Sequence, residues 1–374
     1  MLPPTFEDIV AAREFISPYL PKTPLVHIPK LSEKLGCDYY AKLENLQPTG
    51  AFKVRGGVNL VGNEVGTTRG RNLSDEKNSA PSLRLGGEGL SEEIHRRVAE
   101  SAEVARRRLT LISASTGNHG QSIAYGGRLF DARVIIYAPT ENVNESKMQA
   151  TRDLGAEVRL HGRDFDEARL ECERVAREEG FRYVHSANEP KLIAGVGTIG
   201  LEIFEDLPDV DVIIAPAGGG SCASGNCIVA NKLNPRVRVI AVQSEAAPAL
   251  WHAWKTRTLD PYPTMETAHE GLATRVPFEL TNKIIWELAD DFVLVTDEQI
   301  NEAIALLARH AKQVAEGAGA ASLAAAIKLV NQDKRGSSPT LREGSDHHGL
   351  RGKKVVGIVT GGNIPLERFS GVIS

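Results

Sequence analysis

From Leu111 to the C-terminus, short apolar runs alternate with longer stretches of helical periodicity, and this alternation narrows the possible folds more than any other feature. The runs Val212–Ala215 and Val355–Val359 are continuously apolar, which is typical of strands buried on both faces of a parallel sheet. Strands are predicted at 39–44, 110–113, 133–138, 156–160, 182–185, 211–216, 237–243, 291–295 and 354–359, with helices at 118–129, 144–153, 164–179, 223–232, 297–313 and 319–331. The sequence therefore predicts an α/β protein.

Composition excludes several classes of function. A chain of 374 residues suits about two domains. Its net charge of -4 gives no strong attraction to nucleic acid or to an anionic membrane. No run of about 18 apolar residues is present, and the N-terminus lacks the pattern of a signal peptide. The 4 cysteines form no CxxC pair, which favours reduced thiols in a cytoplasmic protein.

Two stretches interrupt the pattern. Residues 62–90 are polar and lose apolar periodicity, and Ser91–Arg108 is a strongly charged helix candidate. We interpret 62–108 as an inserted polar loop and helix, with a mobile surface loop at 62–90. A second polar insertion at 331–352 contains Asp346-His347-His348, a trio that is more often solvated than metal-binding.

One lysine, Lys53, lies in an unusual sequence context. Lys53 lies between Phe52 and Val54 and is followed by Gly56-Gly57, where the backbone or a ligand can approach closely. A lysine in a partly apolar pocket loses proton affinity and becomes a usable amine nucleophile. The stretch therefore indicates a candidate Schiff-base lysine. A solvated surface lysine remains the alternative when this stretch is taken alone.

Three further loops follow predicted strands. Ser113–Gln121 and Pro216–Gly225 each join a strand to a helix, so each offers backbone N–H groups and a helix N-terminus to an anion. The second loop has three successive glycines but lacks both the GxGxxG spacing and a GK[ST] ending. Thr360–Asn363 ends the last strand. Because parallel sheets bind ligands at the carboxyl ends of their strands, these loops are expected to converge on one crevice.

The motifs AFKVRGG, STGNHGQ, AGGGSCASG, AEGAGAASLAA and TGGNI occur in the order found in the serine/threonine dehydratase and serine racemase family. The chain resembles this family of fold-type-II pyridoxal-phosphate enzymes, which are similar to the tryptophan synthase β subunit, over nearly its whole length except the insertions. The resemblance implies two open, twisted, mostly parallel sheets flanked by helices. It also implies a discontinuous large domain of residues 1–53 and 189–374, a small domain of residues 54–188, pyridoxal 5′-phosphate and a homodimer.

The same resemblance assigns roles to individual residues. Lys53 would carry the cofactor as a Schiff base, Phe52 would flank the cofactor ring, and Asn118 would bond its 3′ oxygen. The other assignments are the substrate carboxylate for Ser115, Thr116 and His119, the cofactor phosphate for Gly218, Gly219, Gly220, Ser221 and Cys222, the pyridine nitrogen for Thr360, and the vicinity of the substrate hydroxyl for Glu270. A surface acidic residue remains the alternative for Glu270.

The sequence departs from the family pattern at several positions. Ala51 replaces a common serine, Ser221 replaces a glycine, and Cys222 stands where an apolar residue is usual. Thr116 occupies the place of the serine that serves racemases as an acid. Relatives bind a divalent cation through several carboxylates, whereas Glu245 alone makes a poor cage, so we expect no tightly bound metal.

The resemblance, together with Lys53 and the three loops, implies an enzyme that removes water and then ammonia from a β-hydroxy amino acid. L-Threonine or L-serine is the expected substrate, giving 2-oxobutanoate or pyruvate plus ammonia. Serine racemase and 3-hydroxyaspartate dehydratase remain alternatives on the same cofactor. A nucleotide-binding oxidoreductase lacks the required glycine spacing and leaves Lys53 and Thr360 without a role.

Overall fold

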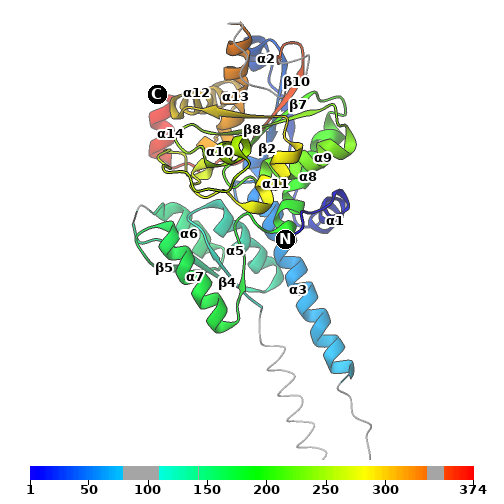
Figure 1. Ribbon diagram of the computed structural model, residues 1–374, viewed down its shortest axis with the longest axis vertical. Coiled ribbons are helices and arrows are strands. Elements are labelled where there is room, and N and C mark those ends of the chain that lie inside the picture. The colour runs from blue at the N-terminus through cyan, green and yellow to red at the C-terminus, as the bar shows by residue number, and fades with distance from the viewer. Residues whose placement is uncertain (79–108, 142, 335–348) are drawn as a thin grey trace, which may run out of the picture.

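The computed structural model describes residues 1–78, 109–141, 143–334 and 349–374, and it contains two open sheets flanked by helices (Figure 1). The larger sheet has the order β1-β2-β10-β7-β8-β9, and the smaller has the order β5-β4-β3-β6. The strands of the larger sheet are β1 (Leu25–His27), β2 (Asp38–Leu43), β7 (Val212–Pro216), β8 (Arg238–Ser244), β9 (Asp291–Val295) and β10 (Lys354–Val359). The predicted α/β class with two mostly parallel sheets is confirmed.

The larger sheet is parallel except for β1, which pairs antiparallel with β2. Its central strands β7 and β10 are buried along almost their whole length, as their apolar sequences predict. Helices α2 (Pro29–Leu35), α12 (Asp297–Leu306) and α13 (Gly317–Lys334) pack against one face, and α8 (Pro190–Asp206), α9 (Ser221–Leu233), α10 (Ala249–Thr256) and α11 (Glu279–Leu288) pack against the other. The sheet therefore lies between two apolar layers.

The smaller sheet consists of β3 (Thr110–Ala114), β4 (Arg133–Ala138), β5 (Glu157–Leu160) and β6 (Arg182–Tyr183), all parallel. Helices α3 (Lys53–Asn78) and α5 (Asn118–Phe130) supply apolar side chains to one face, and α7 (Phe165–Glu179) covers the other. Helix α6 (Glu145–Asp153) joins β4 to β5. This second layered unit lies beside the larger one (Figure 1), and Asn118, the first residue of α5, bonds Glu316 just before α13.

The prediction of a loop from residue 62 is wrong for the part that the structure describes. Helix α3 continues without a break to Asn78, and its second half extends beyond the body of the protein (Figure 1). Its first half packs Val58, Leu60 and Val61 into the core, which provides a nucleus from which the helix propagates. The rest of the expected insertion, residues 79–108, lies outside the described residues, as does most of 331–352, because α13 ends at Lys334 and the description resumes at residue 349.

Other helices differ from the sequence-based expectation. The helix predicted at 297–313 becomes regular α12 up to Leu306 and a π-helical segment over Leu307–Ala311. Helices α8, α10, α11 and α14 (Leu366–Ile373) had not been predicted. At the N-terminus, α1 (Phe6–Ile16) packs against α8 through Ile9 and Ala12. None of the described helices is long and apolar enough to cross a membrane.

The two sheets are compatible with the predicted division at about residues 53 and 189. Every strand of the smaller sheet lies within 54–188, and every strand of the larger sheet lies outside it. Helix α8 contacts α9, α3 and α1 and thus links the two parts of the discontinuous unit. The domain boundaries themselves remain a prediction.

Candidate active site

The loops expected to converge are joined by backbone contacts. The N–H of Phe52 donates to the carbonyl of Thr360 at 2.9 Å, and Ala51 forms an isolated bridge with Gly361. The Lys53 ammonium donates to Ser221 Oγ at 3.1 Å, which connects the N-terminus of α3 to the glycine loop. The structure therefore brings Lys53, the glycine loop and the end of β10 together, as the strand-end argument predicts.

Lys53 is the first residue of α3, and its side chain is half-buried. Its Nζ lies 5.2 Å from the centroid of the Phe52 ring. Burial lowers the pKa of Lys53 to about 8, because a charged amine is poorly solvated there. Burial also raises the pKa of the neighbouring Cys222 thiol far above its usual value, so Cys222 stays protonated and does not compete as a nucleophile.

The glycine loop connects β7 to α9. Gly220 adopts a left-handed conformation with φ +86°, which favours glycine, and it caps α9. A Cβ on Gly218 would lie 2.0 Å from the carbonyl oxygen of Gly271, so only glycine fits there without a backbone shift. Thr274 and Thr281 donate to the carbonyls of Gly218 and Gly219 at 3.0 and 2.9 Å. The loop is thus fixed at a helix N-terminus suited to an anion.

Thr360 ends β10 and is 2% exposed. Its Oγ1 is buried and has no hydrogen-bond partner among the described residues. A buried hydroxyl without a partner is costly, so it points to a ligand group that would complete it. Its neighbour in sequence, Gly361, lies against Ala51 and Glu316, where a side chain would clash.

The STGNHG loop leads from β3 into α5. Ser115 Oγ accepts the N–H groups of Gly117 and Gly120 at 3.2 and 2.9 Å, so this hydroxyl shapes the loop. The side chain of His119 turns into the core, where its Nε2 lies 3.0 Å from Ser113 Oγ, and burial lowers its pKa to about 3. The N–H groups of Asn118 and His119, in the first turn of α5, have no intrahelical partner and can bind a carboxylate. Thr116 is half-buried beside them.

Asn118 belongs to a hydrogen-bonded network that the sequence had not suggested. Its Nδ2 donates to Glu316 Oε1 at 2.6 Å, and its Oδ1 accepts from Asn363 Nδ2 at 2.8 Å. Glu316 and Asn363 lie inside the AEGAGAASLAA and TGGNI motifs, so the motif order could have indicated them. Both residues approach Asn118 from the larger sheet.

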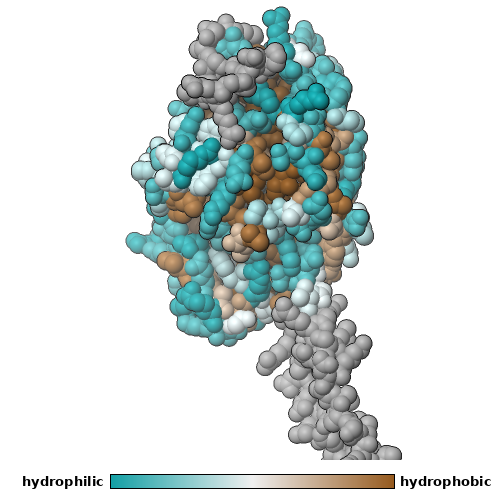
Figure 2. Space-filling model, turned by 45° about the vertical axis from the view of Figure 1, so that its right-hand side comes forward, coloured by the Kyte–Doolittle hydropathy of each residue, from teal (hydrophilic) through white to brown (hydrophobic). Residues whose placement is uncertain are grey.

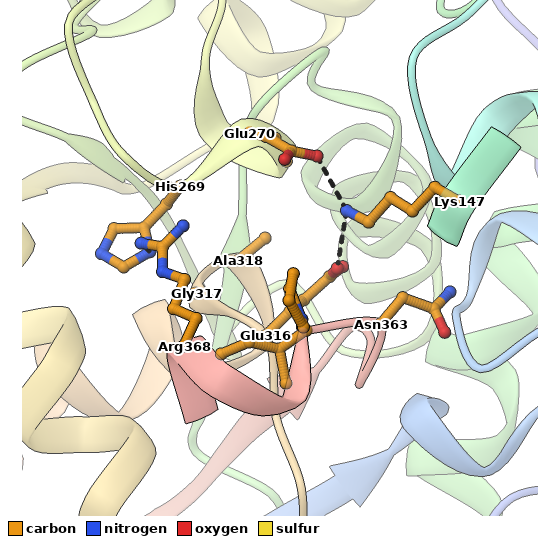
Figure 3. Close-up of a pocket in the computed structure, with 11 residues that line it drawn as sticks. Lys147, His269, Glu270, Glu316, Gly317, Ala318, Asn363 and Arg368 are labelled. Carbon is orange, nitrogen blue, oxygen red and sulfur yellow. Dashed lines mark hydrogen bonds and ion pairs between the residues drawn. The ribbon is translucent and has the colours of Figure 1, made fainter. Parts of the chain in front are cut away.

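A small pocket opens next to this network (Figure 3). Lys147 reaches into it from α6 and forms ion pairs with Glu270 at 2.9 Å and with Glu316 at 3.5 Å. Glu270 is in the short η2 helix (Glu270–Leu272), and its side chain is 47% exposed. The structure therefore places Glu270 at the edge of the site, paired with a lysine that the sequence had not singled out.

Near Glu245, where relatives bind a cation, the carboxylate of Asp297 is occupied by hydrogen bonds from the protein. Asp297 accepts hydrogen bonds from Ser244 Oγ, Thr267 Oγ1 and the N–H of Ala268, at 2.7 to 2.9 Å. Within the described part of the chain, no group of three or more His, Cys, Asp and Glu side chains is placed to hold a metal ion.

Comparison with known proteins defines the class of this site. Residues 16–341 match the model of the family described as pyridoxal-phosphate-dependent enzyme, and the chain belongs to that family. It is 34% identical over 374 residues to the L-threonine ammonia-lyase of Thermotoga maritima, covering 99% of this chain and 78% of the relative. It is 33% identical to a catabolic L-threonine dehydratase of Staphylococcus aureus, covering 98% of this chain and 91% of the relative. The serine racemase structure from Dictyostelium discoideum superposes with a TM-score of 0.74 at 27% identity, covering 97% and 99% of the two chains.

The residues present fit pyridoxal phosphate. Lys53 supplies an amine with lowered proton affinity, and the loop at Gly218–Gly220 supplies a phosphate cradle in which a side chain at Gly218 or Gly220 would clash. The hydroxyl of Thr360 supplies an unpartnered polar group at the end of β10. An amine, an anion site and an orphaned hydroxyl match the aldehyde, phosphate and ring nitrogen of the cofactor.

The lowered pKa of Lys53 predicts how the apo-protein captures the cofactor. The neutral amine attacks an aldehyde, so the attachment rate should rise about tenfold per pH unit below the pKa and level off above about pH 8. An ordinary lysine would level off near about pH 10.4. Stopped-flow absorbance with sub-saturating cofactor measures the rate. If the rate instead levels off near the pKa of an ordinary lysine, burial does not lower the pKa of Lys53 in the apo-protein.

Proposed function

We propose that the protein catalyses β-elimination from L-threonine or L-serine, giving 2-oxobutanoate or pyruvate plus ammonia. The observation that carries this proposal is the placement of a half-buried Lys53 of lowered pKa between the glycine loop and the orphaned hydroxyl of Thr360. The two relatives named L-threonine ammonia-lyase and L-threonine dehydratase favour threonine over 3-hydroxyaspartate. The substrate is in any case a small amino acid.

Bound pyridoxal phosphate supplies an electron sink for the bonds at the substrate Cα. The cofactor phosphate would occupy the cradle of Gly218, Gly219, Gly220, Ser221 and Cys222, and Phe52, Asn118 and Thr360 would contact its ring. Because Thr360 carries a hydroxyl rather than a carboxylate, it would not hold a proton on the ring nitrogen. A hydroxyl at this position would therefore limit negative charge on the ring and favour prompt loss of the β-hydroxyl over return of the Cα proton.

Residues of the chain bind the substrate and transfer the proton. The N-terminus of α5, with Ser115, Thr116 and the backbone of His119, binds the substrate carboxylate. Lys53 as a free amine removes the Cα proton, since its lowered pKa leaves a useful fraction neutral near physiological pH. Ser221 Oγ orients that amine at 3.1 Å. Glu270 lies at the edge of the site, where it would be near the hydroxyl of the substrate.

Amino-acid racemisation is the second candidate, because the chain superposes on a serine racemase. Racemisation needs an acid on the face of Cα opposite Lys53, and Thr116 is the residue we assign to that place. Its β-methyl group restricts χ1, and proton transfer requires accurate placement. Elimination needs no such acid, because the hydroxyl leaves before Cα is reprotonated.

We therefore expect 2-oxo acid to form from L-serine or L-threonine at least about tenfold faster than the D-isomer, a barrier difference of about 1.4 kcal/mol. A keto-acid assay and chiral chromatography on the same sample measure both products. Thr116→Ala should keep most of the lyase activity, because the α5 N-terminus still binds the carboxylate. If D-serine forms as fast as pyruvate and Thr116→Ser raises it further, the protein is a racemase.

We further propose that the enzyme acts as a homodimer in the cytoplasm. All four cysteines are free and buried, which suits a reducing compartment. Figure 2 shows an apolar area across the middle of one face, of the kind that a second copy would cover. Light scattering after size exclusion should give twice the mass of one chain, and a monomer over the working concentration range would refute the dimer.

A further inference from the structure

Lys147 is a buried cation at the substrate side of the site to which no motif assigns a role. Its side chain is 8% exposed, and its Nζ contacts Glu270 at 2.9 Å and Glu316 at 3.5 Å. A Cβ added at Gly117 would lie 3.5 Å from its Cδ, so its stem passes along the STGNHG loop. Figure 3 shows the ammonium between the two carboxylates, with α6 on one side and η2 on the other.

A chain of hydrogen bonds leads from Lys147 through Glu316 to Asn118 and on to Asn363. The donor and acceptor of each bond beyond Glu316 follow from the backbone carbonyl at the end of the chain. The backbone carbonyl of Thr49 can only accept, so Asn363 presents its Nδ2, which also donates to Asn118 Oδ1. Asn118 must then present its own Nδ2 to Glu316 Oε1, at 2.6 Å. An amide NH₂ has two hydrogens, so one N–H of Asn118 remains for another acceptor.

We propose that Lys147 is a positioning residue that holds Glu316 as a carboxylate, so that Glu316 fixes the Asn118 amide and leaves its second N–H for the cofactor. The proposal rests on the cofactor-binding role of Asn118 given above. A carboxylate can only accept, so it holds one N–H of Asn118 in the orientation that Asn363 also imposes. A protonated carboxyl is a weaker acceptor and can itself donate, so it would loosen this hold on the amide.

The charges around Glu316 support this role. Burial raises the pKa of Glu316, while the ammonium of Lys147 and the amide of Asn118 oppose the effect, and Glu270 adds to it. The other titratable groups lining the pocket, His269 and Arg368, contact each other at 3.0 Å. Without Lys147, two carboxylates would face each other with no ammonium between them, which favours protonation of the more buried one, Glu316.

The test is a double-mutant cycle on cofactor affinity. Apo-forms of the wild type, Lys147→Met, Glu316→Gln and the double variant are titrated with pyridoxal phosphate between about pH 6 and pH 8.5, and binding is followed by absorbance. We expect Lys147→Met to bind at least about tenfold more weakly than wild type at the low end, equivalent to one unit of pKa. The ratio of the dissociation constants of Lys147→Met and wild type should return toward one as the pH rises, because Glu316 then ionises without the help of Lys147.

In the Glu316→Gln background, Lys147→Met should change affinity less than about twofold at every pH, since glutamine accepts from Asn118 without a counter-charge. Lys147→Gln should reproduce the pH dependence if Lys147→Met folds poorly, and Lys283→Met, on the exposed surface of α11, is the matched control. A ratio that stays flat with pH, or an equal effect in both backgrounds, would overturn the proposal. Because binding is measured on the apo-protein, a failed elimination assay alone would count against the proposed reaction and not against this role.

Discussion

Replacement of Lys53 by alanine should lower the rate of 2-oxo acid formation by at least about 10³-fold, because the variant loses the amine that holds the cofactor and removes the Cα proton. Borohydride treatment followed by intact-mass analysis should show a permanent cofactor adduct in the wild type and none in Lys53→Ala. The wild-type protein should also be yellow when it is loaded, and the variant should lose the corresponding band on dialysis.

Two comparisons make this result specific to Lys53. Lys283→Met, on the outer surface of α11, should keep full activity and the adduct. Lys147→Met should keep the adduct even where affinity falls, because its amine faces carboxylates rather than the glycine loop. An adduct that persists in Lys53→Ala would move the Schiff base to another lysine and remove the basis of the proposed reaction.

The larger sheet except β1 could be predicted, because its strands are short apolar runs whose length and bounding residues distinguish them from helices. Strands β9 and β10 begin and end at the residues predicted, since a continuous apolar run bounded by polar residues leaves little freedom. Helix α8 was missed because Gly195, Gly197 and Gly200 suggest a turn. In the structure these glycines permit close helix packing, and a Cβ on Gly195 would lie 2.5 Å from the carbonyl oxygen of Arg55.

At the site, too, local patterns could be predicted from the sequence, whereas contacts between distant segments could not. Local sequence patterns indicated the chemistry of Lys53, the glycine loop and Thr360. The structure brings these three elements together. Lys147 and Glu316 meet across 169 residues of sequence, and such a pairing leaves no periodic signal in either segment. His119 lies in a motif that could be recognised from the sequence, but the direction of its side chain could not be predicted: its ring is buried, with Nε2 at 3.0 Å from Ser113 Oγ.

A buried ion cluster beneath Lys53 carries the second large expected effect. Arg55 lies two residues after Lys53 on α3 and bonds both Glu44, at 2.7 Å, and Glu202, at 2.8 Å. Lys42 also contacts Glu202, at 2.6 Å, and all four of these side chains are at most 1% exposed. These four groups are two cations and two anions, and a third cation, the partly exposed Arg13, contacts Glu202 from the edge at 3.2 Å. The cluster ties α3 to β2 and α8.

Arg55→Met should lower the free energy of unfolding by about 3–5 kcal/mol, because it leaves an uncompensated buried carboxylate and several unsatisfied acceptors. That loss is a large part of the total stability of about 5–15 kcal/mol that is usual for a folded protein. Urea unfolding followed by circular dichroism measures it. Lys30→Met, which breaks the exposed Lys30–Glu33 pair, should leave the midpoint unchanged.

The double variant Arg55→Met/Glu44→Gln separates charge balance from simple loss of contacts. It removes one cation and one anion, and it leaves Lys42 and Arg13 paired with Glu202, so the net charge of the cluster is the same as in the wild type. Its destabilisation should therefore be smaller than the sum of the two single effects by at least about 1 kcal/mol. The double variant should also recover part of the cofactor affinity that Arg55→Met loses, because Lys53 depends on the first turn of α3 being held in place. Strict additivity would mean that each side chain contributes through packing alone, and that the charges beneath Lys53 do not act as a unit.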